Sequence, residues 1–372
     1  MEIQWLKNLI EKIQVVINHN KVNSPSLKIS NKAKDAKTQV GQIIVNQGLS
    51  YSDAKDLIIS VVDQKMITFK DEAKTTFDQR TGEFKKLLSE KIRDLPEKEM
   101  GKLRDPDTQI ALLEAASISG RKSNDELRNL LANLVVSRIK NDSSGKEELK
   151  NIVYNEAIST VSKLTIDQLK VIALCYLLRY TSYGGIISWE TFNNYLNTHI
   201  KPFMGFKNSN AQFQHIEYAG CGSIGIGSWN LIEIYRQQYS FLFLNLIEKE
   251  KIDGLNLPKE ILAEIIKLDP GEGKYFISVR NKIILEKYLN NKHLTEETTK
   301  QFSALYEQSI KSPDEVKKKI QDETDIGKEF IELSDGNANI LHLSLTSVGI
   351  AIGASYFEQT VGEKINIDIW IN

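Results

Sequence analysis

One stretch decides the fold: SYSDAKDLIISVVDQKMITFKDEAKTTFDQRTGEFKKLLSEKI, residues 50–92. Ser50 is a favourable N-cap, and Asp53 three residues later resembles a capping box in which Asp replaces Glu. No proline interrupts the stretch before Pro96. Apolar or small residues recur through it at helical spacing, namely Ala54, Leu57, Ile58, Val61, Val62, Met66, Phe69, Ala73, Phe77, Phe84, Leu87, Leu88 and Ile92. We therefore predict a long amphipathic helix that begins at Ser50.

The length of this helix bears on assembly. At ~1.5 Å per residue, a continuous helix here is on the order of 60 Å long, which exceeds the diameter of a small domain. Either the helix bends near Gly82, or it packs along another long helix, such as that of a second copy. We expect a homo-oligomer, with contacts through Leu57, Val61, Phe69, Phe77, Phe84 and Leu88.

Helical periodicity continues along most of the chain. Residues 1–18 predict an amphipathic helix that packs on the body, on a partner subunit or on a membrane surface. Residues 19–48 predict a break with a strand or extended arm. Further helices are expected over residues 106–116, 124–139, 147–161, 165–179, 188–196 and 230–247, and in three segments of 258–320 beside a strand-like piece at 274–279. The expected organisation is an N-terminal helix and arm (1–48), the long helix (49–100), a helical core (101–255) and a C-terminal part (256–372).

The end of the chain has a different pattern. Residues 330–333 and 340–345 flank Asp335-Gly336 and predict a hairpin, residues 346–357 predict a helix, and residues 365–371 alternate like a strand. We therefore predict a mainly α protein with a small α+β, winged-helix-like tail. The Gly349–Gly353 pair favours close helix packing or dimerisation. Winged helices often bind DNA, but residues 343–353 contain no Arg or Lys to attract phosphate.

Composition limits the function classes. The chain has 372 residues and a formal net charge of −1, which excludes a globally basic nucleic-acid binder. Two cysteines, Cys175 and Cys221, fit a reducing compartment. We find no signal-peptide pattern and no apolar run near the ~20 residues that span a bilayer, so we expect a cytoplasmic protein without a transmembrane segment. A basic stretch is either a solvated linker or a weak nucleic-acid contact, formed by Lys28, Lys32, Lys34 and Lys37.

Two motifs resemble known sites. Gly220-Cys-Gly-Ser-Ile-Gly225 has dinucleotide-binding spacing, with a possible strand before it at 215–218, but the helical context favours a tight packed turn. Glu272-Gly-Lys274 resembles the carboxylate–lysine element of metal-dependent nucleases, for which Asp253 and Asp269 are the nearby acids. Neither acid lies on a recognisable partner strand.

The remaining chemistry-bearing residues are scattered. The histidines do not show metal-ligand spacing, and they are His19, His199, His215, His293 and His342. Neither a Gly-x-Ser-x-Gly elbow nor a phosphate-binding loop is present. We expect no cofactor and no metal, and catalytic residues stay unknown. A site assembled from scattered residues remains an alternative, so the sequence leaves open whether the chain is an enzyme.

Three groups of residues together carry a family resemblance: QGLSYSDA at 47–54, LRDPDTQ at 103–109 with NEAI at 155–158 and KLT at 163–165, and LTSVGIAIG at 345–353 with IWI at 369–371. They resemble the uncharacterised bacterial LPO/Vpar-type family along nearly the whole chain. The middle helices are loosely similar to Abi-alpha-like abortive-infection proteins. The resemblance implies a bacterial protein and a role in phage defence, and it carries no catalytic motif.

These observations support three hypotheses. The first is a helical interaction protein that oligomerises and acts in bacterial anti-phage defence or stress response, with a possible protein partner in a defence system. The second is a nucleic-acid-binding sensor that uses the C-terminal tail and the arm at Lys28–Lys37. The third is a defence effector enzyme, such as a nuclease, with a scattered site.

Overall fold

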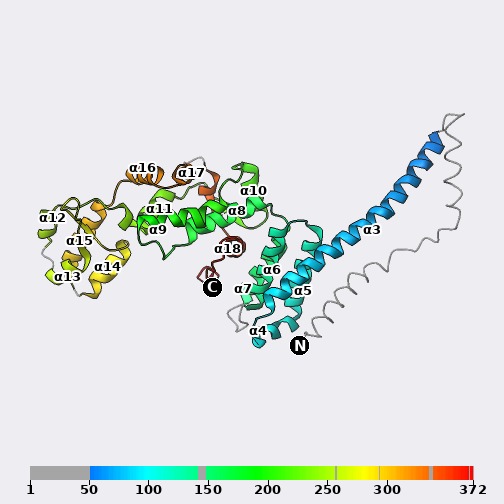
Figure 1. Ribbon diagram of the computed structural model, residues 1–372, viewed down its shortest axis with the longest axis horizontal. Coiled ribbons are helices and arrows are strands. Elements are labelled where there is room, and N and C mark those ends of the chain that lie inside the picture. Colours follow the sequence, from blue (N-terminus) through cyan, green and yellow to red (C-terminus); the bar gives the residue numbers. More distant parts are fainter. Residues whose placement is uncertain are drawn as a thin grey trace. The chain divides into compact units, whose positions relative to one another are not determined.

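The computed structural model describes residues 51–140, 148–255, 258–292, 294–334, 338–367 and 369–371, with side chains from Lys70 onward. The described residues are mainly helical, as predicted, with 16 α-helices and a few small two-stranded sheets (Figure 1). The chain divides into two compact units: Met1–Lys86 with Leu112–Ser123, and Leu87–Ala111 with Asn124–Asn372. The expectations for residues 1–48 and for the N-cap at Ser50 lie outside the described residues.

The first unit is built on α3, Tyr51–Ile92, a single helix of 42 residues. The helix continues through Gly82 without a break, so α3 does not end at that glycine. Its partner in this unit is the second half of α5, Pro106–Arg121. Phe77 packs so closely over Gly120 that a Cβ on that glycine would lie 2.6 Å from the Phe77 ring. Arg80 also donates from Nη1 to the Arg121 carbonyl at 3.4 Å.

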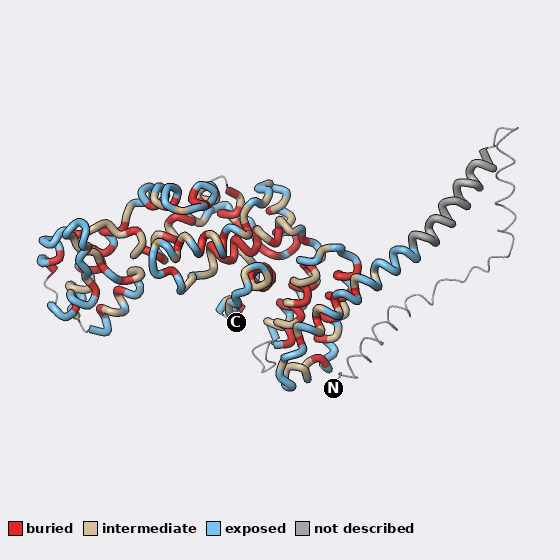
Figure 2. Tube along the Cα trace, in the orientation of Figure 1, coloured by how far each residue is buried: buried red, intermediate tan, exposed pale blue. Residues whose placement is uncertain are grey.

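The second unit has its core around α18, Ser347–Val361. This helix packs on α6 (Asp125–Lys140), α7 (Glu148–Val161) and α8 (Ile166–Cys175). Every residue from Gly349 to Phe357 is buried, and so are seven of the ten residues of α8 (Figure 2). A helix that is apolar on all sides belongs in a core, and the helices predicted over 165–179 and 346–357 are confirmed.

The two glycines of α18 allow this close packing. A Cβ on Gly349 would overlap the Cys221 carbonyl oxygen and lie 2.9 Å from its carbon, while a Cβ on Gly353 would lie 3.1 Å from the Ile172 carbonyl oxygen. The backbones of α18 and its neighbours therefore approach more closely than side chains would permit. Close helix packing in the core, one of the two readings of this glycine pair, is confirmed.

Shorter elements surround the core of the second unit. The helices are α4 (Glu97–Gly101), α9 (Trp189–Tyr195), α10 (Asn210–Tyr218), α11 (Leu231–Gln238), α12 (Lys249–Asp253), α13 (Lys259–Ile265), α14 (Lys282–Asn291), α15 (Glu296–Ser309), α16 (Pro313–Glu323) and α17 (Gly327–Glu332). The strands are β1 (Gly222–Ile224) with β4 (Leu343–Leu345), and β2 (Ile266–Leu268) with β3 (Tyr275–Ile277), both antiparallel. β3 confirms the strand-like piece at 274–279.

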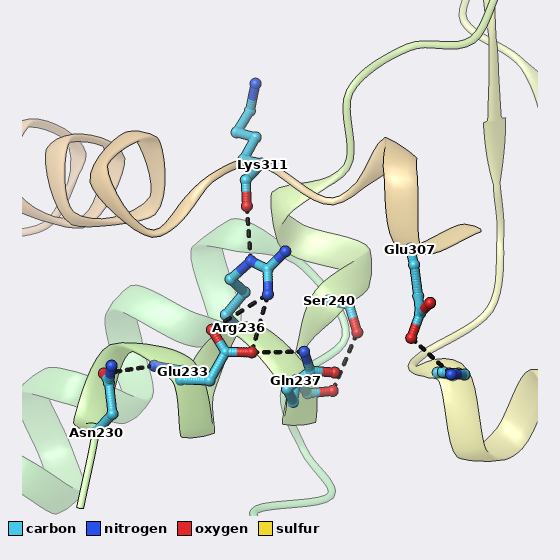
Figure 3. Close-up of polar contacts among 8 residues, drawn as sticks. Asn230, Glu233, Arg236, Gln237, Ser240, Glu307 and Lys311 are labelled. Atoms are coloured by element: carbon cyan, nitrogen blue, oxygen red, sulfur yellow. Dashed lines mark hydrogen bonds and ion pairs between the residues drawn. The ribbon is translucent and has the colours of Figure 1, made fainter. Parts of the chain in front are cut away.

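Side-chain caps begin many of these helices. Thr165 forms a complete capping box with Gln168, and Ser188 forms another with Thr191. At α11, Asn230 caps the helix and Arg236 ties it to the segment before α16 (Figure 3). The Arg236 Nε donates to the Lys311 carbonyl at 2.7 Å, and its Nη1 donates to Glu233 at 2.9 Å.

The structure corrects four local predictions. Residues 330–333 lie in and just after α17, because Ile326 and Phe330 are both buried at helical spacing. The hairpin is therefore wrong, and β4 pairs with β1, more than a hundred residues earlier in the chain. Residues 365–371 form no strand where they are described, and residues 215–218 end α10 instead of forming a strand. The helix expected over 230–247 stops at Gln238 and gives way to a 3₁₀ turn, Ser240–Phe243.

Candidate functional site

A pocket lies where two helices end in π-helical turns. α8 continues into the π-helical turn Tyr176–Tyr180, and α9 continues into the π-helical turn Leu196–Ile200. Such turns are rare and frequently occur at functional sites. Both turns line a cavity of about 430 Å³ in the second unit. That volume falls within the ~300–1,000 Å³ that is typical of small-molecule sites.

Aromatic rings form much of the wall of this pocket. The Tyr183 ring stacks on Tyr195, with 5.3 Å between centroids and 20° between planes, and lies 4.6 Å from the His199 ring. From the C-terminal segment, Trp370 lies edge-on to Tyr176 at 5.5 Å. Phe357 of α18 also lines the pocket. Three parts of the chain that are distant in sequence therefore meet at one mostly apolar cavity.

His199 is the most buried polar side chain in the pocket, at 5% exposure. The Thr198 hydroxyl donates to the Asn194 carbonyl at 2.8 Å, so its oxygen accepts from His199 Nδ1–H at 2.7 Å. The opposite nitrogen, Nε2, lies 3.2 Å from the Glu363 carboxylate. That approach is not aligned as a hydrogen bond, so Nε2 is buried without a hydrogen-bond partner. A buried polar group in this condition costs about 1–3 kcal/mol.

Arg179 supplies positive charge to the pocket. One nitrogen, Nη1, donates to the Leu343 carbonyl at 3.0 Å and to Ser344 Oγ at 2.6 Å, which fixes the side chain against β4. The guanidinium lies over the Tyr180 ring at 5.6 Å. Its Nε and Nη2 make no hydrogen bond to any residue that the structure describes. Among the described residues, one edge of this half-buried guanidinium is therefore without a hydrogen-bond partner.

The hydroxyl and thiol groups near the pocket are not activated. Burial raises the pKa of the Tyr195 and Tyr180 hydroxyls above the ordinary tyrosine range. Burial also raises the pKa of the Cys175 thiol to about 12, against a smaller lowering by Arg179. Because Thr198 gives its proton to a backbone carbonyl, His199 does not act as its base. This arrangement suits binding by charge and stacking better than nucleophilic catalysis.

A second polar cluster joins the start of α5 to α6 and α7. The Arg138 side chain, 4% exposed, donates from Nη2 to Asp107 at 2.8 Å, and Asn155 donates to the same carboxylate oxygen at 2.8 Å. These two hydrogen bonds lower the pKa of Asp107. Asp105 accepts hydrogen bonds from the Thr108 amide and hydroxyl. The cluster neutralises a buried arginine and holds three helices together.

The sequence motifs that resemble known sites have packing roles. Gly220–Gly225 follows a helix and forms a turn and strand, so the strand–turn–helix order of a dinucleotide site is absent there. The turn is packed against the end of the chain, since the Gly225 amide donates to the His342 carbonyl at 2.9 Å. Lys274 pairs with Glu248 at 2.9 Å. Within the described residues, no group of three or more His, Cys, Asp or Glu gathers as metal ligands.

The residues proposed for assembly fall into three groups. Phe84 and Leu88 are buried within the chain, at 1% and 6% exposure, and Phe77 is partly covered over Gly120. Leu57, Val61 and Phe69 lie on the part of α3 whose side chains are not described. The basic residues lie outside the described residues altogether, and they are Lys28, Lys32, Lys34 and Lys37.

Sequence reasoning missed the pocket at Arg179 and His199. The sequence signal that was present is the run Tyr180-Thr-Ser-Tyr183, which follows a buried helix and places aromatic and hydroxyl residues at its end. The contribution of Trp370 was hidden because residues 365–371 read as a strand. Nothing in the spacing of these residues indicates that they meet.

The fold and these sites define a mainly helical protein with a buried aromatic pocket and no helix, in the described part, that is long and apolar enough to cross a membrane. A protein-family model described only by the suffix "-like" matches residues 48–371, and the chain belongs to that family. The description states no activity or partner. No curated protein and no solved structure matched the chain.

Proposed function

We propose that the protein is a helical interaction protein that assembles with a second copy through the N-terminal part of α3 and acts in bacterial anti-phage defence or stress response. The observation that carries this proposal is the exposure of α3 over residues 70–76. All seven of these consecutive residues are exposed. With about 3.6 residues per turn, they cover every face of the helix.

An uncovered helix of this kind needs additional stabilisation. Isolated helices shorter than ~12–15 residues are marginal in water even when they are rich in alanine, and most helical stability in proteins comes from packing of an apolar face. Packing within the first unit begins at Phe77 and continues at Thr81, which is 4% exposed. Over residues 70–76, α3 therefore packs on no other helix that the structure describes.

The sequence of α3 before Phe77 favours a helical partner. Leu57, Val61 and Phe69 fall on one apolar stripe, whereas residues 70–74 carry both Lys and Asp or Glu. An apolar stripe with balanced charges beside it is typical of a helix that packs along another helix. Phe84 and Leu88 serve the chain's own core, so the proposed assembly surface contains Leu57, Val61 and Phe69.

Substitution in the stripe tests the assembly proposal. The double variant Val61→Glu, Phe69→Glu should be monomeric by sedimentation, because two carboxylates would have to be buried at the helix–helix contact. The control Lys74→Glu adds a glutamate at an exposed position of the same helix and should leave the mass unchanged. If the double variant and the parent chain have equal masses at every concentration, assembly through this surface is contradicted.

The defence role rests only on the loose resemblance of the middle-helix sequences to Abi-alpha-like abortive-infection proteins, a link that the comparisons with known proteins do not show. Bacteria that express the parent chain should resist at least one phage of a diverse panel, measured as a fall in plating efficiency. Bacteria that express the double variant should lose that resistance. If expression of the parent chain lowers the plating efficiency of no phage in the panel, the defence role is refuted. The assembly proposal is then judged by the sedimentation result alone.

A further inference from the structure

We infer that the pocket lined by the two π-helical turns, Tyr176–Tyr180 and Leu196–Ile200, binds a small planar aromatic molecule that carries one anionic group. This inference concerns the second unit and is independent of assembly through α3. It rests on three features of the pocket: a guanidinium edge without a partner among the described residues, walls of aromatic rings, and a volume suited to one small molecule.

The anionic group follows from Arg179. Its Nη1 is fixed on Leu343 and Ser344, while Nε and Nη2 have no hydrogen-bond partner among the described residues. The Nε–Nη2 edge of a guanidinium matches the two oxygens of a carboxylate or phosphate. Because the side chain is half-buried, an ionic hydrogen bond to it is stronger than one in open water. A ligand group that presents two anionic oxygens side by side therefore fits this edge.

The flat body of the ligand follows from the rings around it. Tyr183 is stacked on Tyr195 and is thereby held in one orientation, while Trp370 is fixed edge-on against Tyr176. Aromatic pairs are favourable at centroid separations of ~4.5–7 Å, in stacked or edge-to-face geometry. Preoriented rings lose little conformational freedom when a ligand ring packs on them.

The number of charges in the pocket favours a single acidic group. Glu363 lies at 3.2 Å from His199 Nε2 and is the only acidic residue among the described residues that line the pocket. A second anionic group on the ligand would therefore meet a carboxylate instead of a free cation. The cavity of about 430 Å³ also leaves no room for a long polymer. Two sources share the required chemistry, an aromatic carboxylate and a purine mononucleotide.

Calorimetric titration of the full chain with two matched pairs distinguishes these sources. The probes are indole-3-acetate with its neutral amide, and adenosine 5′-monophosphate with adenosine. At least one anion should bind, and its neutral counterpart should bind about tenfold more weakly or worse because the pairing with Arg179 is lost. Binding of the carboxylate alone, or of the nucleotide alone, assigns the source. Equal affinity for the charged and neutral members, or binding of neither anion below millimolar concentration, overturns the inference.

Two variants connect the binding to these residues. Arg179→Lys keeps a positive charge but has no Nε–Nη2 edge, so anion affinity should fall about tenfold. The control Arg236→Lys changes an arginine of similar structural role, bonded to Lys311 and Glu233 away from the pocket, and should leave affinity unchanged. Trp370→Leu should weaken both members of a bound pair, because it removes a ring and no charge. If both Arg179→Lys and Trp370→Leu bind the anion with the affinity of the parent chain, the inference is contradicted.

Discussion

Replacing Gly349 by alanine should destabilise the second unit strongly. Gly349 lies in the first turn of α18, where its amide donates to the Thr346 hydroxyl at 3.2 Å. A Cβ there would overlap the Cys221 carbonyl oxygen. That same oxygen accepts a hydrogen bond from the Thr346 amide at 3.0 Å. The obstacle is therefore backbone that is already fixed, not a side chain that can turn away.

The size of the effect follows from three contributions. Inserting a methyl group into a packed core typically costs about 1–3 kcal/mol, and the upper end applies here because backbone must move. Loss of the Thr346–Cys221 hydrogen bond adds about 1 kcal/mol. The higher helix propensity of alanine offsets about 1 kcal/mol of this destabilisation. We expect a loss of about 3 kcal/mol, which for a unit of this size corresponds to a fall in Tm of roughly 6–12 °C.

Thermal unfolding followed by circular dichroism measures this change, and two other glycines provide controls. Gly353→Ala places a Cβ 3.1 Å from the Ile172 carbonyl oxygen, so it should lie within about 1 kcal/mol of the parent chain. Gly82→Ala meets nothing within 4 Å and should raise local helix stability by about 0.5–1 kcal/mol. A Tm for Gly349→Ala equal to that of Gly353→Ala would refute the close approach of α18 to Cys221.

Two further predictions concern ionisable groups. Burial raises the pKa of both cysteine thiols to about 12, so neither Cys175 nor Cys221 should react with a thiol reagent at pH 8 until the chain is unfolded, and rapid labelling of the native chain would contradict their burial. The pKa of Asp107 is lowered in the folded chain, so its contribution is complete above the unfolded value near 3.8 and is lost as the pH falls through the folded pKa. Asp107→Asn should therefore cost about 2 kcal/mol near neutral pH, because it leaves the buried Arg138 with only the more distant Asp105 carboxylate, at 3.8 Å, while Asp107 itself is half-exposed. This difference from the parent chain should shrink in urea titrations below about pH 4, and a difference independent of pH would show that Asp107 does not act through its charge.

The sequence was a good guide where local pattern and packing agree. Residues 51–92 are helical because apolar spacing, the lack of proline and good helix formers all point to one state. The Gly349–Gly353 pair indicated a close helix contact for the same reason. Local chemistry also explains the caps at Thr165 and Ser188, whose side chains bond the first turns of their helices.

The sequence was a poor guide where partners are distant along the chain. β4 looked like half of a hairpin, but its partner β1 lies in a glycine-rich segment that read as a turn. The pocket brings together Arg179, His199 and Trp370, and no spacing rule connects them. Its π-helical turns also have no sequence signature, since their register depends on how the surrounding helices pack.

The mass of the parent chain in solution tests the central claim most directly. Sedimentation equilibrium over a wide concentration range should give a species of at least twice 42.2 kDa, because α3 is exposed on every face over residues 70–76 and its sequence before them carries an apolar stripe that suits a partner helix. A mass of 42.2 kDa at every concentration, with the full helical signal of α3 retained, would contradict assembly through this helix.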